Sequence, residues 1–156
     1  MKQLEWKCKR FEQLDNNQLY DLIKFRVNIF VVEQNCPYPE LDEKDRVTDA
    51  HHLIAYHNSN IVAYARLLPP GVSYPESSVG RFAVDASLRL QGIGSILMNQ
   101  CLEQIAILWP EHDIKVSAQA HLKKFYQGFN FSQTSESYLE DGIPHIEMLK
   151  SKPHVQ

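Results

Sequence analysis

The segment from Arg89 to Ser95 holds the residues whose types and spacing point most clearly to chemistry. It reads Arg-Leu-Gln-Gly-Ile-Gly-Ser and joins an apolar stretch, 79–84, to an amphipathic stretch, 93–108. Glycines let the backbone approach an anion closely, and the free N–H groups at a helix start point toward the same place. The segment is therefore predicted to bind a diphosphate group.

Glycine spacing separates this loop from two other phosphate-binding patterns. A dinucleotide-binding fingerprint needs a third glycine, but Ser95 and Ile96 are followed by Leu97. A P-loop needs a lysine between its last glycine and the Ser or Thr, but here Ser95 follows Gly94 with no lysine between them. A helix start with incidental glycines is the remaining alternative.

Composition limits the class of protein. The length of 156 residues predicts a single domain over 1–156, and 44% hydrophobic with 22% charged residues is ordinary for a globular protein. A formal net charge of -3 gives no basic surface for nucleic acid. The chain shows no membrane span and no signal peptide, which predicts a cytoplasmic protein. Cys8, Cys36 and Cys101 are far apart, so neither disulfides nor a zinc site is expected.

Hydrophobic periodicity predicts the elements that position the loop. Alternation over 4–8 predicts a strand, an apolar stripe over 19–30 a helix, and 35–49 a long acidic loop. Further expected elements are strands 52–56, 61–68 and 78–84, helix 93–108, strand 114–118, helix 122–129, and a hairpin of 131–138 and 143–149. This order predicts an α/β (α+β) fold, a mixed twisted sheet of about seven strands with helices on both faces.

Further motifs accompany the glycine loop. They are the segment 26–38, the run Ala118-Gln119-Ala120-His121-Leu122, the pair Phe125-Tyr126, and the segment Glu140-Asp141-Gly142-Ile143-Pro144-His145-Ile146. Over about 6–148, the chain resembles the ElaA-type members of the GNAT (Gcn5-related N-acetyltransferase) superfamily. The resemblance implies acetyl-CoA as the acyl donor, no metal, and direct acetyl transfer to a primary amine of a small molecule or peptide. It leaves homodimer formation open.

The resemblance also implies how acetyl-CoA is held. Phe82, Ala83 and Val84 occupy the position of a family strand that diverges from its parallel neighbour and pairs with the pantetheine arm. One of their N–H groups would stabilise the oxyanion of the tetrahedral intermediate. The loop would bind the pyrophosphate through the backbone of Arg89, Leu90, Gln91, Gly92, Ile93, Gly94 and Ser95. The Arg89 side chain either adds charge at the rim or is simply solvated.

Tyr126 is the candidate proton donor. It matches the family tyrosine near the CoA sulfur, and its hydroxyl would protonate the leaving thiolate. The neighbouring Phe125 and Phe129 also allow a purely structural role in the core.

The general base has several candidates. Glu33 follows an apolar run, so its carboxylate is expected to be partly buried, with a pKa raised toward that of a useful base. Its alternative role is to pair with Arg26 or Arg66. His145 and His121 are rival bases through imidazole chemistry.

Two features bear on the acceptor. The acidic stretch 40–45 is either a solvated loop or, if it lines the site, a surface that favours a cationic amine. Cys36 raises a route through an acetyl-cysteine, but no neighbouring residue supplies a base, so direct transfer is preferred.

Two other functions remain in view. Arg26, Phe30, Asp42 and Asp45 occur in an order that resembles acyl-homoserine lactone synthases, which lack this glycine loop. A non-catalytic acetyl-CoA-binding module is the alternative from another class. Turnover with a panel of amines separates it from an enzyme.

Overall fold

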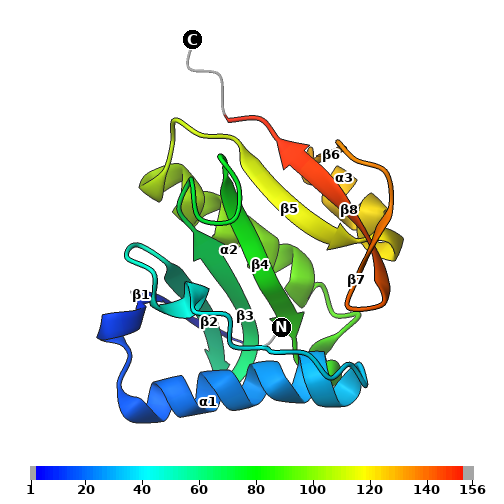
Figure 1. Cartoon of the computed structure of the whole chain (residues 1–156). Helices are drawn as coiled ribbons and strands as arrows, with labels where there is room; N and C mark the ends of the chain where they lie inside the picture. The colour runs from blue at the N-terminus through cyan, green and yellow to red at the C-terminus, as the bar shows by residue number, and fades with distance from the viewer. Residues whose placement is uncertain (1–2, 153–156) are drawn as a thin grey trace.

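The computed structural model describes residues 3–152. Within them, eight strands form one mixed sheet in the order β1-β2-β3-β4-β5-β8-β6, and β7 pairs with β8 (Figure 1). The strands are β1 (Glu5–Arg10), β2 (His51–His57), β3 (Asn60–Leu68), β4 (Ser77–Val84), β5 (Ile114–Gln119), β6 (Ser132–Gln133), β7 (Tyr138–Glu140) and β8 (Ile143–Lys150). The α-helices are α1 (Asn16–Val27), α2 (Ile93–Leu108) and α3 (Lys123–Gln127). The predicted fold class is confirmed.

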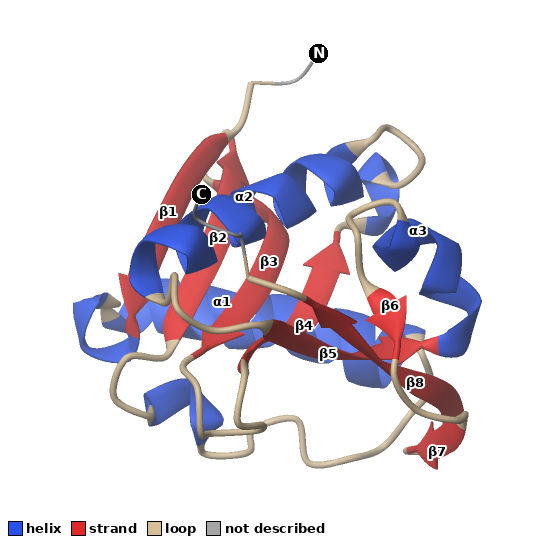
Figure 2. Cartoon of the chain, turned by 90° about the horizontal axis from the view of Figure 1, so that it is seen from above, coloured by secondary structure: helices blue, strands red, loops and turns tan. Residues whose placement is uncertain are grey.

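Helices cover both faces of the sheet (Figure 2). Leu53 and Ala55 of β2 pack in the larger core with buried side chains of α2 and α3, whereas Ile54 packs with Leu22 of α1 and Tyr64 of β3. Because side chains alternate across a strand, β2 and β3 must be apolar on both faces. This burial explains their nearly continuous hydrophobic sequence.

Helix α1 leads directly into a segment that lines a cavity. Asp15 caps it by accepting a hydrogen bond from the Gln18 N–H at 2.8 Å, and the Gln18 side chain accepts one from the Asp15 N–H at 3.0 Å. The helix then continues into a π-helical turn over Asn28–Glu33, which sequence periodicity did not predict. Wider turns of this kind are frequent at functional sites. Here the turn brings Phe30 and Glu33 to the rim of a cavity.

The prediction of one continuous strand over 131–138 was wrong. The chain forms two separate strands there, β6 and β7. Between them, the Ser135 hydroxyl accepts a hydrogen bond from the Glu147 N–H at 2.9 Å, which breaks the regular ladder. Strand β7 then pairs again with β8, and its register places Tyr138 opposite His145.

No helix within residues 3–152 is both long and apolar enough to cross a membrane. Cys8, Cys36 and Cys101 are all free thiols.

Candidate active site

Strands β4 and β5 are parallel neighbours that pair only at their first residues. Ser77 pairs with Ile114 and Ser78 with Lys115, and the two strands share no further paired positions (Figure 1). A cavity of about 390 Å³ lies beside β4, lined also by β5, the π-helical turn and the hairpin of β7 and β8. The later residues of β4 therefore face an opening instead of a neighbouring strand.

A β-bulge lies in the pairing of β4 with β3, within the stretch of β4 that no longer pairs with β5. Tyr64 of β3 pairs with Ala83 and Arg66 pairs with Gly80, so β4 uses one residue more than β3 over this interval. Arg81, inside the bulge, has a left-handed φ of 51°. A non-glycine residue held there costs on the order of 1 kcal/mol, and such strain gathers at functional sites. Bulges turn the backbone and interrupt pairing, and this bulge does so directly before Phe82.

The glycine loop leads into the N-terminus of α2. Gly92 occupies the N-cap with a φ of 79°, no side chain caps the helix, and its first turn contains no acidic residue. A side chain added at Gly92 would meet no atom within 4 Å, and one at Gly94 would approach only Phe125, at 3.9 Å. The space beside both glycines is thus open, and the first amides of α2 have no capping side chain, as an anion site at a helix start requires. These features fit a diphosphate.

Arg89 and Glu33 form an ion pair at the rim of the cavity. The Arg89 guanidinium donates to the two Glu33 oxygens at 2.6 and 3.1 Å and to the Val84 carbonyl at 3.0 Å. Glu33 is therefore paired with Arg89, and the expected pairing with Arg26 or Arg66 was wrong. Its side chain is 40% exposed, so the carboxylate is only partly buried. The pair links the glycine loop to the π-helical turn.

Tyr126 packs in the core and also reaches the cavity. Its ring packs edge-on against Phe125 and Phe131, with centroid distances of 5.4 and 5.7 Å. Its side chain also lines the cavity, although the residue is only 7% exposed. Burial raises the pKa of Tyr126, so the hydroxyl stays protonated and able to donate.

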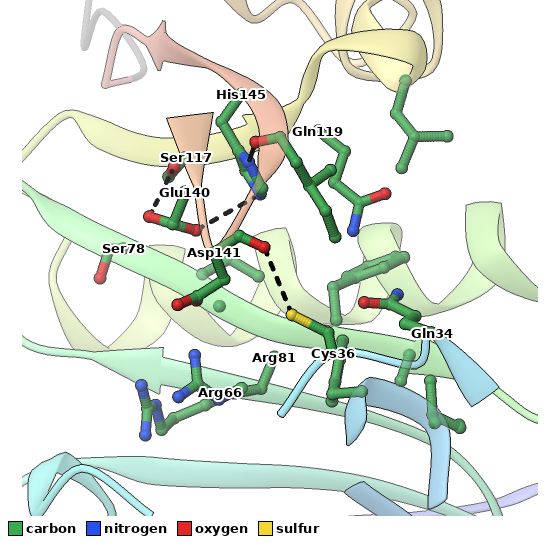
Figure 3. A pocket seen from close by; sticks show the side chains of 18 of the residues that line it. Gln34, Cys36, Arg66, Ser78, Arg81, Ser117, Gln119, Glu140, Asp141 and His145 are labelled. Carbon is green, nitrogen blue, oxygen red and sulfur yellow. Dashed lines mark hydrogen bonds and ion pairs between the residues drawn. The ribbon is translucent and has the colours of Figure 1, made fainter. Parts of the chain in front are cut away.

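His145 and Glu140 meet on the wall of the cavity that the hairpin of β7 and β8 forms (Figure 3). His145 Nδ1 lies 2.7 Å from the Ile143 carbonyl oxygen, and Nε2 lies 3.3 Å from Glu140 Oε2. A carbonyl can only accept, so Nδ1 carries the hydrogen and Nε2 of the neutral ring is left as a proton acceptor. The Glu140 carboxylate therefore lies on the Nε2 side of the ring.

A short chain of polar groups extends from this pair. Ser117 Oγ contacts the Tyr138 hydroxyl at 2.5 Å and donates to Glu140 Oε1 at 3.4 Å. The Tyr138 ring is stacked on His145 with centroids 6.3 Å apart. The Glu140 carboxylate is thus held by β5 as well as by its own hairpin.

The acidic stretch is not a solvated loop, and that expectation was wrong. Glu40 is 4% exposed and Asp45 is 8% exposed. The buried Arg26 donates to Glu40 at 2.5 Å and to Asp45 at 2.6 Å. Buried carboxylates need such partners, because desolvation of an unpaired charge is very costly.

Two further arginines complete this arrangement. Arg66 donates to both Asp42 oxygens, at 2.8 and 2.9 Å, and to Asp45 at 3.1 Å. Arg81 pairs with Glu40 and Asp42. Burial alone would raise the pKa of Asp42, but the hydrogen bonds from Arg66 outweigh it and lower that pKa to about 2. The members of this arginine–carboxylate cluster are Arg26, Glu40, Asp42, Asp45, Arg66 and Arg81.

Other candidates from the sequence have clear locations. His121 is exposed and does not line the cavity, whereas Cys36 lines it and donates to the Asp141 carbonyl at 3.4 Å (Figure 3). Glu140 and Lys44 also line the cavity but were not chosen from the sequence. The hairpin register could have indicated Glu140 as a neighbour of His145, but no local pattern pointed to Lys44.

Comparison with known proteins identifies the family. Residues 30–152 match the family model of the acetyltransferase (GNAT) domain, so the chain belongs to the GNAT acetyltransferase family. It is 41% identical to Protein ElaA of Escherichia coli over 147 residues, which are 94% of this chain and 96% of ElaA. The crystal structure of E. coli ElaA matches with a TM-score of 0.91 at 40% identity, over 96% of this chain and 100% of that chain. The ElaA-type resemblance is confirmed.

Two other solved structures have a similar fold. An acyl-CoA N-acyltransferase from Pseudomonas aeruginosa matches with a TM-score of 0.92 at 41% identity, over 96% of this chain and 100% of that chain. The AHL synthase LasI matches with a TM-score of 0.76 but only 11% identity, over 97% and 91% of the two chains. The likeness to LasI therefore concerns the fold alone.

Proposed function

We propose that this protein transfers the acetyl group of acetyl-CoA directly to a primary amine of a small molecule or peptide. The observation that carries the proposal is the opening between β4 and β5, with a glycine loop at its end and a polar cavity beside it. An extended arm with a diphosphate at one end fits this arrangement. The three free thiols are compatible with the reducing cytoplasm, where we place the reaction.

Backbone groups hold the donor in this proposal. Free N–H and C=O groups of Phe82, Ala83 and Val84 bond to the pantetheine arm, and the amides from Arg89 to Ser95 bind the pyrophosphate. One β4 N–H, freed by the bulge at Arg81, donates to the thioester oxygen. That contact stabilises the negative charge that develops there, which is typically worth a few kcal/mol.

Proton transfer is assigned to two side chains. His145 Nε2 removes the proton from the acceptor ammonium, and Glu140 stabilises the resulting imidazolium. The amine nitrogen then forms a bond to the acetyl carbon as the carbon–sulfur bond breaks. Tyr126 donates its hydroxyl proton to the departing thiolate, and the nitrogen now bonded to the acetyl carbon gives up its surplus proton to the Tyr126 oxygen, which leaves a neutral amide. Glu33 remains the rival base, although its position beside Arg89 also suits it to hold the glycine loop.

The acidic stretch does not supply the negative surface that would favour a cationic amine. Glu40, Asp42 and Asp45 are balanced by Arg26, Arg66 and Arg81, so the stretch presents no excess negative charge.

A panel of primary amines with acetyl-CoA tests the proposed function. We expect thiol release that depends on the amine and is matched one to one by N-acetylated product. Acetyl-CoA binding without turnover on any amine would instead indicate a non-catalytic binding module.

A further inference from the structure

Among residues 3–152, Lys44 is the one cavity-lining cation that forms no ion pair. Its ammonium donates to the Ser73 hydroxyl at 2.9 Å, and the side chain is half-buried. The other cavity-lining cations are paired: Arg66 and Arg81 with carboxylates of the arginine–carboxylate cluster, and Arg89 with Glu33. A half-buried ammonium held only by a hydroxyl retains an unbalanced charge that an anionic ligand group can meet.

The arginine–carboxylate cluster does not supply the missing anion. Its three arginines face three carboxylates, and of the three carboxylates only Asp42 lines the cavity. Both Asp42 oxygens already accept hydrogen bonds from Arg66. This side of the cavity therefore has a net positive charge, which Lys44 contributes.

The hairpin of β7 and β8 gives the other side of the cavity the opposite charge. Glu140 and Asp141 line that side together with His145 (Figure 3). The same view places Arg66 and Arg81 away from Glu140 and His145, across the cavity. Asp141 forms no ion pair within residues 3–152, so the hairpin side carries carboxylate charge that attracts an ammonium group.

We infer that the acceptor amine also carries a carboxylate, so that its chemical class is an amino acid. Its ammonium lies toward Glu140 and His145, and its carboxylate binds Lys44 and the Ser73 hydroxyl. One unpaired lysine balances one negative charge, which favours a carboxylate over a doubly charged phosphate group. This inference rests on the proposed function, because it names the substrate class of the same site.

The test compares amines of matched length with and without the carboxylate. The probes are glycine, β-alanine, 4-aminobutyrate and 5-aminopentanoate, each beside its primary amide and its aminoalkylphosphonate. The measurement is kcat/KM from thiol release at saturating acetyl-CoA. For at least one chain length, we expect kcat/KM for the carboxylate to exceed kcat/KM for its amide by about tenfold or more. This is the scale of one charged hydrogen bond.

Lysine variants assign the preference to Lys44. In Lys44→Met the ratio of carboxylate to amide should fall toward one, and Lys44→Arg should restore most of it. The matched control is Lys24→Met, which removes the same charge from an exposed position of α1 and should keep the wild-type ratio. Acetyl-CoA affinity, measured by calorimetry, verifies that each variant is folded.

Several results would overturn the inference. They are amides that equal or exceed the carboxylates at every length, phosphonates that exceed the carboxylates, or a wild-type ratio that persists in Lys44→Met. A failure of the proposed function looks different, because no amine of any class would then release thiol.

Discussion

The two sides of the cavity are built from different chemical groups. The proposed donor side consists of β4 backbone over 82–84, which lines the cavity, and the loop 89–95, which adjoins it through Arg89. The relevant groups there are amides and carbonyls. The acceptor side consists of charged side chains from the arginine–carboxylate cluster, Lys44 and the hairpin of β7 and β8. A backbone site binds the part of the substrate that every acetyl-CoA shares. A side-chain site changes with the sequence, so it can determine which amine is accepted.

This contrast predicts separable effects of mutation. Changes on the donor side should affect acetyl-CoA binding and leave folding nearly intact. Changes in the arginine–carboxylate cluster should affect folding first, because its charges are buried and depend on each other.

Gly92→Glu should give the largest effect, a loss of acetyl-CoA affinity of at least 100-fold. The change places a negative side chain where the diphosphate binds, at a φ of 79° that only glycine adopts easily. Gly71→Glu is the control, since it has a similar φ of 91° and equally open surroundings, far from the loop in sequence. Calorimetry with acetyl-CoA should show binding in the control alone. Unchanged affinity in Gly92→Glu would remove the loop from the donor site.

Asp45→Asn should lower the free energy of unfolding by about 3 kcal/mol, because two buried arginines lose a charged partner. Urea unfolding measures the change. Glu43→Gln is the control, since Glu43 pairs with Arg46 on the exposed surface, where ion pairs contribute little. A midpoint in Asp45→Asn equal to that of the control would contradict the structural importance of the cluster.

His145→Gln should reduce kcat/KM for the amine by about 100-fold or more, the usual scale for a general base. Glu33→Gln should mainly change acetyl-CoA affinity, since Glu33 holds Arg89. Steady-state kinetics with one amine separates the two effects. The opposite outcome, with turnover lost only in Glu33→Gln, would assign the base to Glu33.

Tyr126→Phe should lower kcat by about 100-fold with little change in acetyl-CoA affinity, because the ring remains packed and only the hydroxyl is lost. Tyr20→Phe, at a position 71% exposed, is the control and should match the wild type. Full turnover in Tyr126→Phe would leave Tyr126 with a packing role alone.

Acid should weaken the arginine–carboxylate cluster in a defined pH window. The pKa of Asp42 is about 2 in the folded protein and about 4 in an unfolded chain, so its stabilisation is present above pH 4 and lost toward pH 2. Wild type should therefore exceed Asp42→Asn in unfolding free energy by about 1 to 2 kcal/mol at pH 6, with the difference shrinking between pH 4 and pH 2. Urea unfolding across this range provides the check, and a constant difference would contradict it.

The sequence predicted the strand, loop and helix around the glycine loop because their signals are local. Glycine spacing, a helix start and strand alternation all lie within a few residues of each other. The resemblance to the GNAT family further implied that β4 diverges from β5, and the strand pairing confirms this divergence. The π-helical turn was missed because its apolar spacing resembles that of an ordinary helix.

The acceptor side was predicted poorly because its contacts are long-range. Arg26 meets Glu40 14 residues away, Arg66 meets Asp42 24 residues away, and Arg81 meets the Glu40 carbonyl 41 residues away. A run of acidic residues resembles a solvated loop unless the buried arginines are placed beside it. For the same reason, the ion pair of Glu33 with Arg89 could not be anticipated.

A structure of the protein with CoA bound tests the central claim most directly. We expect the pantetheine arm between β4 and β5, bonded to backbone groups of 82–84, and the diphosphate on the amides of 89–95. The arginine–carboxylate cluster should keep its present pairs. A diphosphate bound by cluster arginines, or a pantetheine arm outside the opening, would contradict the division between a backbone donor side and a charged acceptor side.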